Sequence, residues 1–284
     1  MPLANAKDLL MDAEKGGYAV GAFNCSNMEI LQAIVSAAEE MAAPVIVQAS
    51  QGAVKYAGLE YIAAMVKTAA EMASVPIAVH LDHGTSFEQV IKCIRLGFTS
   101  VMFDGSMLPF DENVVKTAEV VKAARAVGVS VEGELGRIGG AEDDVTLGYE
   151  KEFFTDPHEA AIFVEKTGVD FLAVAVGTVH GKYKGVPNIN FELLAEINRK
   201  VGIPLVLHGS SGLPGEDIKK AVSLGVRKVN IDTDLREAFV EGIREALQKH
   251  PEEIDPRKIL GPAREKVKEA VEEKINYLGC AGTV

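Results

Sequence analysis

The sequence predicts an α/β protein, a (β/α)8 or TIM barrel, and three observations support that prediction. Eight short strand-like runs recur along the 284 residues, and a longer helical pattern follows each of them. The runs are nearly continuous in apolar residues, as is typical of parallel strands buried on both faces. The first run continues as "GAFNCSN" and not as GxGxxG, which disfavours the runner-up, a doubly wound open sheet.

The eight predicted strands follow one another from residue 18 to residue 231. Three of them open on Pro, which suits the first position of a strand because no ladder N–H is needed there. In chain order they are "YAVGAF" (18–23), "PVIVQA" (44–49), "PIAVHL" (76–81), "SVMF" (100–103), "SVEGEL" (130–135), "FLAVAV" (171–176), "PLVLH" (204–208) and "KVNI" (228–231).

Helical segments are predicted between these strands. The stretch 26–42 begins with Ser26 as N-cap and Glu29 three residues later, the pattern of a capping box. The stretch 156–168 has Asp156 as cap, Pro157 in the first turn and Gly168 at its end. We find no linker or repeat, so one domain over 1–284 is expected, with 250–284 as a C-terminal helical extension.

Composition narrows the class of protein. The net charge of −12 argues against nucleic acid or an anionic membrane as partner. Three cysteines without a CxxC pair indicate a reducing compartment, and the amphipathic, acidic start of the chain is unlike a signal peptide. No apolar run reaches the ~18 residues of a membrane span. We therefore expect a cytoplasmic protein.

Polar residues gather where the predicted strands end, which is where barrel enzymes place their active sites. Only six histidines occur in the chain, and three of them, His83, His180 and His208, stand at such positions. Three neutral imidazoles with an open fourth position are how a catalytic Zn²⁺ is held. The other polar residues at the strand ends are Asn24, Ser50, Asp82, Asp104, Glu134, Asn230 and Asp232.

Two segments after the last two strands are candidate anion sites. "HGSSGLPGEDIKKA" (208–221) places glycines and serines before a helix, and "NIDTDLREAF" (230–239) places Asp232 and Thr233 at another helix start. Glycine-rich backbone and a helix N-terminus both favour bound phosphate. The long segment 135–156 is expected to be an irregular lid with a Gly139–Gly140 hinge, and Lys182 and Lys184 are available to meet a phosphate.

These motifs together resemble the class II, zinc-dependent ketose-bisphosphate aldolases over essentially the whole chain. The resemblance is carried by ordered blocks: "GAFN" (21–24), "HLDHG" (80–84), "GFTSVMFDGS" (97–106), "VEGELG" (131–136), "GGAEDD" (139–144), "AVGTVHGKYKG" (175–185), "PLVLHGSSGLP" (204–214), "KVNIDTDLR" (228–236) and "DPRKILGPAR" (255–264). Gly105 and Gly133 depart from the family forms, although neither removes a chemical group.

The resemblance implies roles for the metal and catalytic residues. His83, His180 and His208 would be the zinc ligands, and Asp104 and Glu134 match a second or resting zinc site. Asp82 would be the acid/base at the aldehyde oxygen of the C3–C4 cleavage. Glu142 would move the proton of the dihydroxyacetone phosphate part.

The resemblance also implies the substrate contacts. The phosphate cradle of the ketone half is matched by Gly181, Gly209, Ser211, Asp232 and Thr233, with Lys184 nearby. Asn230 would contact the substrate itself. Asn24 and Ser50 match other positions of the pocket. Backbone near His180 and Gly209 resembles a site for a monovalent cation, Na⁺ or K⁺. Arg257 matches an arginine that reaches the other phosphate from a neighbouring subunit, which implies a homodimer or homotetramer.

The expected function is therefore reversible cleavage of fructose 1,6-bisphosphate in glycolysis and gluconeogenesis. Tagatose 1,6-bisphosphate is the first alternative, because the two sugars differ at one carbon and no single residue decides between them. A non-catalytic metal-binding barrel that serves as a partner subunit is the second alternative. Such a protein can lose Asp82, Glu142 or a zinc histidine, and all of them are present here.

Overall fold

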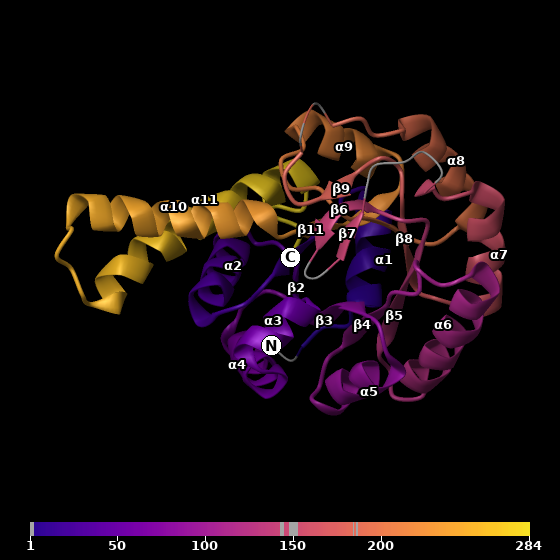
Figure 1. Ribbon diagram of the computed structural model, residues 1–284, viewed down its shortest axis with the longest axis horizontal. Coiled ribbons are helices and arrows are strands. Elements are labelled where there is room, and N and C mark those ends of the chain that lie inside the picture. Colours follow the sequence, from indigo (N-terminus) through magenta and orange to yellow (C-terminus); the bar gives the residue numbers. More distant parts are fainter. Residues whose placement is uncertain (1–2, 143–144, 148–152, 184, 186) are drawn as a thin grey trace.

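The structure, a computed structural model, is a closed eight-stranded parallel barrel surrounded by helices (Figure 1). It describes residues 3–142, 145–147, 153–183, 185 and 187–284, and at 141–142 and 145–147 it describes the backbone alone. The predicted (β/α)8 fold and all eight strands are confirmed. The barrel strands are β1 (Val20–Asn24), β2 (Val45–Ala49), β3 (Ile77–Gly84), β4 (Ser100–Phe103), β5 (Ser130–Leu135), β8 (Phe171–Val174), β10 (Leu205–Leu207) and β11 (Val226–Ile231).

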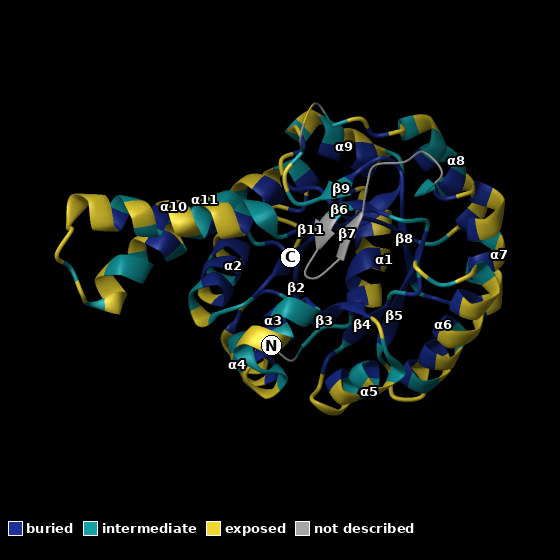
Figure 2. Ribbon diagram, in the orientation of Figure 1, coloured by how far each residue is buried: buried dark blue, intermediate teal, exposed yellow. Residues whose placement is uncertain are grey.

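The barrel closes by the pairing of β1 with β11, and the remaining strands pair with their neighbours in chain order. Every residue of these eight strands is buried, and Figure 2 shows the barrel dark and the helices exposed on their outer faces. The outer helices are α2 (Met28–Glu40), α3 (Gln51–Ala57), α4 (Leu59–Met72), α5 (Phe87–Arg95), α6 (Phe110–Arg125), α7 (Pro157–Thr167), α8 (Phe191–Val201), α9 (Gly215–Ser223) and α10 (Thr233–Lys249). Among the described helices none is both long and apolar enough to cross a membrane.

Helix caps agree with the sequence in one case and differ in another. Asp156 accepts hydrogen bonds from the first backbone N–H groups of α7, and Gly168 ends that helix with a φ of 67°. For α2 the predicted cap was wrong by one residue. Asn27, not Ser26, accepts the N–H of Ile30, because Asn27 is the residue directly before the helix and its side-chain oxygen reaches the donor three residues on.

Among the described helices, α3 is an extra helix between β2 and α4, and α1 and α11 lie outside the eightfold repeat. Helix α1 (Ala6–Gly16) packs against β1, β3 and β11, and the N–H of Ala4 bonds to Ile77 at the start of β3, which places α1 at the amino-terminal end of the barrel. Helix α11 (Pro256–Leu278) covers most of the expected extension. It returns along α10 to α2, and the two helices protrude from the barrel as an arm (Figure 1). Gly242 allows this crossing, since a Cβ there would lie 2.5 Å from the Cα of Ala263.

A small second sheet stands beside the barrel. Strand β6 (Gly139–Glu142) pairs antiparallel with β7 (Val145–Leu147) and parallel with β9 (Val179–His180). The expectation of an irregular segment over 135–156 was therefore wrong at 139–142 and 145–147, which are strands. Its glycines and acids lack the apolar alternation of a strand, and the pairing comes from the neighbouring β9.

Candidate metal and substrate site

Three histidine rings converge at the carboxyl end of the barrel. The ring centroids of His83 and His208 are 4.8 Å apart, and that of His180 lies 5.2 Å and 5.7 Å from them. One nitrogen of each ring lies within 4.8 Å of the others. His83 is the last residue but one of β3, His208 follows β10, and His180 belongs to β9. The tertiary structure thus assembles the three histidines that the sequence singled out.

A β-bulge places His83 beside Asp82. The register of β3 against β4 shifts between Leu81 and Gly84, and His83 has a φ of 51° in the left-handed region. The bulge brings the Asp82 carboxylate to 3.9 Å from the Nε2 atom of His83. In a regular strand two successive side chains point to opposite sides of the pleat, and the bulge breaks that alternation.

Asp104 orients the His83 ring. Its Oδ2 atom lies 2.8 Å from His83 Nδ1, while its Oδ1 accepts hydrogen bonds from the N–H and hydroxyl of Ser106. Burial raises the pKa of Asp104, but the hydrogen bonds from His83 and Ser106 outweigh it and hold that pKa well below its usual range. The Nδ1 atom of His83 therefore donates to Asp104, and its Nε2 atom faces the other histidines.

Glu132 orients His208 from inside the barrel. Its Oε1 atom accepts from His208 Nε2 at 2.8 Å, and its Oε2 atom lies 2.8 Å from the Nζ of Lys228. All three side chains are fully inaccessible to solvent. Burial raises the pKa of Glu132, and the Lys228 ammonium, His208 and the buried His80, 3.4 Å from Glu132 Oε2, together lower it far more. Burial lowers the pKa of His208 and keeps the imidazole neutral, with its Nδ1 atom towards His83.

This donor set fits a zinc ion. His208 Nδ1 and His83 Nε2 face each other across 3.1 Å, with both opposite nitrogens donating to carboxylates. A proton or a cation must therefore lie between them. Two nitrogens bound tetrahedrally at 2.0–2.1 Å stand about 3.3 Å apart, close to the observed separation. His83, Asp104 and Glu134 form a second group of donors within 4.8 Å, so His83 belongs to both.

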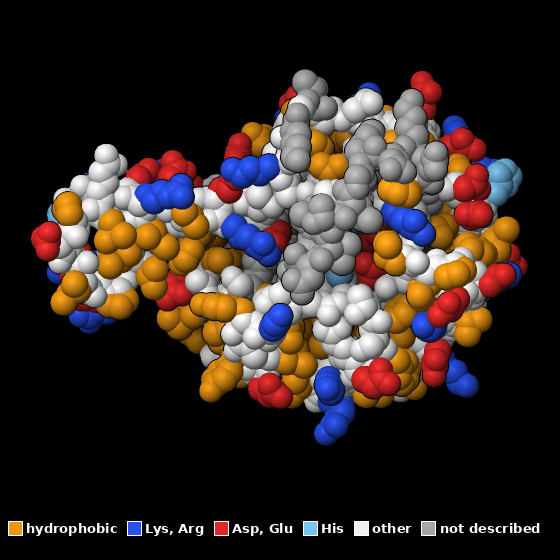
Figure 3. All heavy atoms as spheres, viewed as in Figure 1, with side chains coloured by type: hydrophobic (Ala, Val, Ile, Leu, Met, Phe, Trp, Pro, Cys, Tyr) orange, Lys and Arg blue, Asp and Glu red, His pale blue; other side chains and the backbone are white. Residues whose placement is uncertain are grey.

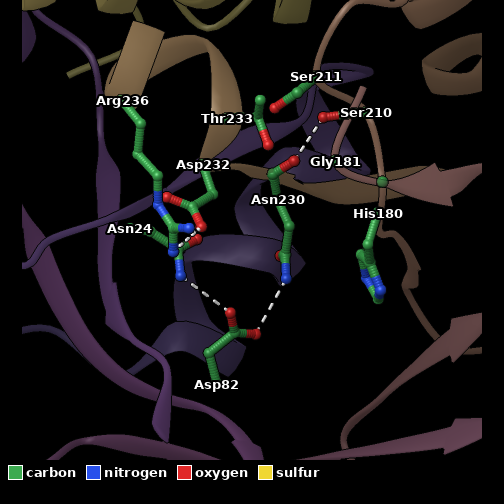
Figure 4. A pocket seen from close by; sticks show the side chains of 11 residues that line it. Asn24, Asp82, His180, Gly181, Ser210, Ser211, Asn230, Asp232, Thr233 and Arg236 are labelled. Carbon is green, nitrogen blue, oxygen red and sulfur yellow. Dashed lines mark hydrogen bonds and ion pairs between the residues drawn. The ribbon is translucent and has the colours of Figure 1, made fainter. Parts of the chain in front are cut away.

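Asp82 is held by amide groups next to the histidines. Its Oδ2 accepts from Asn24 Nδ2 and its Oδ1 from Asn230 Nδ2, at 3.1 Å and 3.0 Å (Figure 4). Its Oδ2 also accepts from Gln48 Nε2 at 3.1 Å. The residue is 1% exposed. Because amides carry no charge, they fix the direction of the carboxylate without neutralising it. The carboxylate is therefore held in a fixed direction at the wall of the pocket.

The pocket beside Asp82 has the features of an anion cradle. Nine of the predicted residues line it: Asn24, Asp82, His180, Gly181, Gly209, Ser211, Asn230, Asp232 and Thr233 (Figure 4). Gly209 has a φ of 61°, and a Cβ there would lie 2.4 Å from the carbonyl oxygen of Val179. Helix α10 starts in this pocket, and its N-cap Asp232 makes no side-chain capping bond. Arg236 pairs with Asp232, and Lys274 pairs with Asp234 at 2.6 Å. The negative charges of these two acids near the cradle are therefore balanced by cations.

The remaining predicted residues lie in different places. Ser50 caps α3 and lines a small adjoining pocket with Asn24 and Arg236. Glu142 ends β6, two residues after Gly140, which pairs with His180. Lys182 is exposed and pairs with Glu237, and Lys184 lies outside the described residues. Arg257 stands at the far end of the arm, bound to Asp255, with its side chain 89% exposed.

Sequence reasoning missed several residues of the site. Glu132, Lys228 and Gln48 occupy positions inside apolar strands, where a polar residue gives no sign of its partner. Arg236 and Ser210 also line the pocket. The signal that could have found Arg236 is its spacing, because it follows Asp232 by four residues at a helix start and such pairs share one helix face.

Gly105 and Gly133 are explained by packing. A Cβ on residue 133 would lie 2.8 Å from Phe163, and one on residue 105 would lie 2.2 Å from the Oδ1 of Asn113. The Nδ2 of Asn113 in turn donates to the carbonyl of Glu134 at 3.0 Å. Each unusual glycine therefore makes room for a larger side chain beside β5, and neither reaches the site.

A closed barrel with converging histidines, a buried carboxylate and an anion cradle at its mouth is typical of a metal-dependent enzyme that acts on small phosphorylated molecules. Comparison with known proteins identifies the family. Residues 4–283 match the family model described as fructose-bisphosphate aldolase class-II. The chain belongs to the class-II fructose-bisphosphate aldolase family, and the predicted family and enzyme class, a carbon–carbon lyase, are confirmed.

Individual relatives agree over nearly full length. The chain is 50% identical over 282 residues to the probable fructose-bisphosphate aldolase of Bacillus subtilis, with 98% of each chain covered. It is 50% identical to the fructose-bisphosphate aldolase of Thermus caldophilus, with 99% of each covered. Among solved structures, the YdjI aldolase of Escherichia coli K12 is similar with a TM-score of 0.88, 37% identity and 99% coverage of both chains.

Proposed function

We propose that this chain is a zinc-dependent aldolase that reversibly cleaves fructose 1,6-bisphosphate into dihydroxyacetone phosphate and glyceraldehyde 3-phosphate. The observation that carries the proposal is the convergence of His83, His180 and His208 beside the Asp82 carboxylate, at the mouth of an anion cradle. The curated relatives reported above are named for fructose bisphosphate. That naming favours this sugar over tagatose 1,6-bisphosphate.

His83, His180 and His208 are the proposed zinc ligands. Zinc bound there supplies a Lewis acid that polarises the substrate ketone and so lowers the barrier to forming a carbanion next to it. Asp104 and Glu132 hold the ligand rings in the tautomers that direct a lone pair inward. Asp104 and Glu134, together with His83, are proposed to receive the metal in a second, resting position.

Asp82 performs the first proton transfer. Its carboxylate accepts the proton of the C4 hydroxyl as the C3–C4 bond breaks, and it returns that proton in the reverse reaction. The amides of Asn24, Gln48 and Asn230 keep the carboxylate pointed at the reacting bond. Glu142 then donates a proton to C3 of the ketone fragment, from a strand that pairs with His180.

The cradle binds the phosphate of the ketone half. Gly181, Gly209, Ser211 and Thr233 line it and offer backbone and hydroxyl donors beside the start of α10. Lys184 is proposed as an additional cation from its place in the sequence. Asp232 and Asn230 contact the sugar hydroxyls, and Asn24 and Ser50 border the chain of the sugar. Arg236 lies in the same pocket and supplies a cation for an anionic group of the substrate. Na⁺ or K⁺ is proposed near the backbone of His180 and Gly209.

The second phosphate is proposed to meet Arg257 of a neighbouring subunit. Helix α10 has 17 residues and so carries the chain about 25 Å away from the cradle, which puts Arg257 beyond reach of its own site. Figure 3 shows apolar side chains along the protruding arm, where Val240, Leu247 and Ile254 are exposed. An exposed apolar arm favours burial against a second copy. We accordingly propose a homodimer or homotetramer of one-domain chains (1–284) acting in the cytoplasm.

Cleavage assays on both bisphosphates test the proposal. We expect fructose 1,6-bisphosphate to be cleaved faster than tagatose 1,6-bisphosphate, with complete loss in excess EDTA and recovery with Zn²⁺. Borohydride added with substrate is the matched control, since it traps a Schiff base and should leave this enzyme active. Turnover that persists in EDTA would contradict the zinc mechanism. No cleavage of either sugar by the zinc-loaded protein would favour the non-catalytic barrel.

A further inference from the structure

A buried ammonium connects the two halves of the site. Lys228 lies on β11 with its side chain inside the barrel and 0% exposed. Its Nζ atom lies 2.8 Å from Glu132 Oε2 and 2.7 Å from Asn230 Oδ1. Glu132 holds His208, and Asn230 holds Asp82. One side chain thus contacts both the residue behind a metal ligand and the residue behind the acid/base.

Lys228 restricts what its neighbours can present. An ammonium has three donors and no acceptor, so each partner must turn an oxygen towards it. For Asn230, the amide oxygen faces Lys228 and the NH₂ group faces Asp82. For Glu132, one oxygen faces Lys228 and the other accepts from His208, which makes Nε2 the protonated nitrogen of that ring. The Nδ1 lone pair of His208 is then left for the metal.

Stability alone does not account for this arrangement. Taking two charges out of water costs about as much as their attraction returns, and well-packed apolar replacements are often at least as stable. The pair lies in a barrel whose strand residues are otherwise largely apolar and fully buried. A role that an apolar pair could not perform is the control of hydrogen-bond direction.

We propose that Lys228 and Glu132 act together as a tautomer lock, two positioning residues that keep the Nδ1 atom of His208 unprotonated and directed at the metal. The inference rests on the proposed function, because it takes His208 to be a zinc ligand. The Lys228 ammonium requires an oxygen of residue 132 to face it, and the other oxygen of Glu132 accepts the Nε2 proton of His208.

The lock makes an unusual prediction for Glu132→Gln. With Lys228 in place, the new amide must turn its oxygen to the ammonium and its NH₂ group to His208. His208 Nε2 then becomes the acceptor, and the proton moves to Nδ1, where it blocks the metal. Adding Lys228→Met removes this demand. The Gln amide can then rotate, turn its NH₂ group to His80 Nε2, which lies 3.4 Å from Glu132 Oε2, and accept from His208 again. The second substitution should therefore rescue the first.

The test measures tautomers and zinc binding without substrate. Proteins labelled with ¹⁵N-histidine are stripped of metal, and the protonated nitrogen of His208 is read by NMR; zinc affinity is measured by competition with a chelator. We expect Glu132→Gln to invert the His208 tautomer and to weaken zinc binding about 10- to 100-fold. Glu132→Gln with Lys228→Met should recover the native tautomer and most of that loss.

Arg227→Met is the matched control, since it removes a neighbouring β11 cation that pairs with Glu14 of α1, outside the site. Its tautomer and zinc affinity should equal those of the unmodified protein. An unchanged tautomer and affinity in Glu132→Gln would overturn the proposal, as would a double variant no better than the single one. If Glu132→Gln does not fold, an inverted tautomer in the double variant would overturn it. Because no substrate is used, failure to cleave the sugar would leave these results standing.

Discussion

Gly140 of β6 lies directly beside His180 of β9, so close that a Cβ atom on residue 140 would stand 2.1 Å from the carbonyl oxygen of His180. Gly140 also has a φ of 99°, a conformation that L residues with side chains rarely adopt. The sequence indicated a hinge at this glycine. The structure shows that it also permits the pairing that brings the strand of Glu142 next to a metal-ligand candidate.

Gly140→Ala should separate β6 from His180. Displacing Glu142 by about 1 Å is expected to reduce kcat for cleavage by about 10²-fold, because proton transfer depends on position. Steady-state cleavage kinetics measure the effect. Gly185→Ala is the control, since an added Cβ there meets no atom of the described residues within 4 Å, and it should retain full activity. Equal activity of the two variants would show that the β6–β9 pairing does not serve catalysis.

Asp82→Asn should abolish most of the activity without loss of the metal. The amide is of nearly equal size but cannot accept the C4 proton, so kcat is expected to fall by about 10²- to 10⁴-fold. Zinc content and thermal stability of the same preparation serve as controls, because the histidines keep their own partners. A variant with normal kcat would assign the proton to another group.

Arg257 should act on the site of a partner subunit. Asp82→Asn and Arg257→Ala chains are each expected to be impaired when assayed alone at low substrate. In a mixed dimer, one of the two sites has both native residues. Because about half of the randomly reassembled dimers are mixed, about a quarter of the native activity should return. The assay is cleavage after co-refolding of the two variants. Activity that never exceeds the average of the separate variants would place Arg257 outside the site.

Gly133→Ala is expected to lower stability. The added methyl group would stand 2.8 Å from Phe163 and 3.1 Å from Val169, and overpacking of this kind costs about 1–3 kcal/mol of unfolding free energy. Chemical denaturation of the two proteins measures the difference. Gly261→Ala in α11 is the matched control, because its new methyl group meets nothing within 4 Å and removes a helix-destabilising glycine. That variant should gain about 0.5–1 kcal/mol.

The three cysteines should be inert in the native protein. Burial raises the pKa of Cys25, Cys93 and Cys280 to about 12. Because the thiolate is the reactive form, a thiol with that pKa is ionised in only about one molecule in 10⁴ at pH 8. A disulfide reagent should therefore detect no thiol in the native chain and three after denaturation. Rapid reaction before unfolding would contradict the burial of these side chains.

Much of the architecture follows from local patterns. The eight strands were predictable because apolar runs bounded by Pro and Gly repeat along the chain, and each run must be buried on both faces. His83, His180 and His208 could be grouped because parallel strands of a barrel end on one rim. The resemblance to the family added the roles of Asp82 and Glu142, which no spacing rule supplies.

Other features required the folded chain. The bulge that turns His83 towards Asp82 depends on the pairing of β3 with β4. The strands β6 and β7 exist in a glycine-rich segment because β9 lies beside it.

The sequence by itself determined the barrel, its polar rim and the residue types at the site, because hydrophobic periodicity and strand order are local properties of the chain. The tertiary structure decided which nitrogen of His83 and of His208 is available and which buried charges compensate one another. Lys228 and Glu132 illustrate the difference, since each looks out of place in an apolar strand until the barrel closes. The reason is physical: hydrogen bonds and charge pairs depend on distances of about 3 Å between residues remote in sequence.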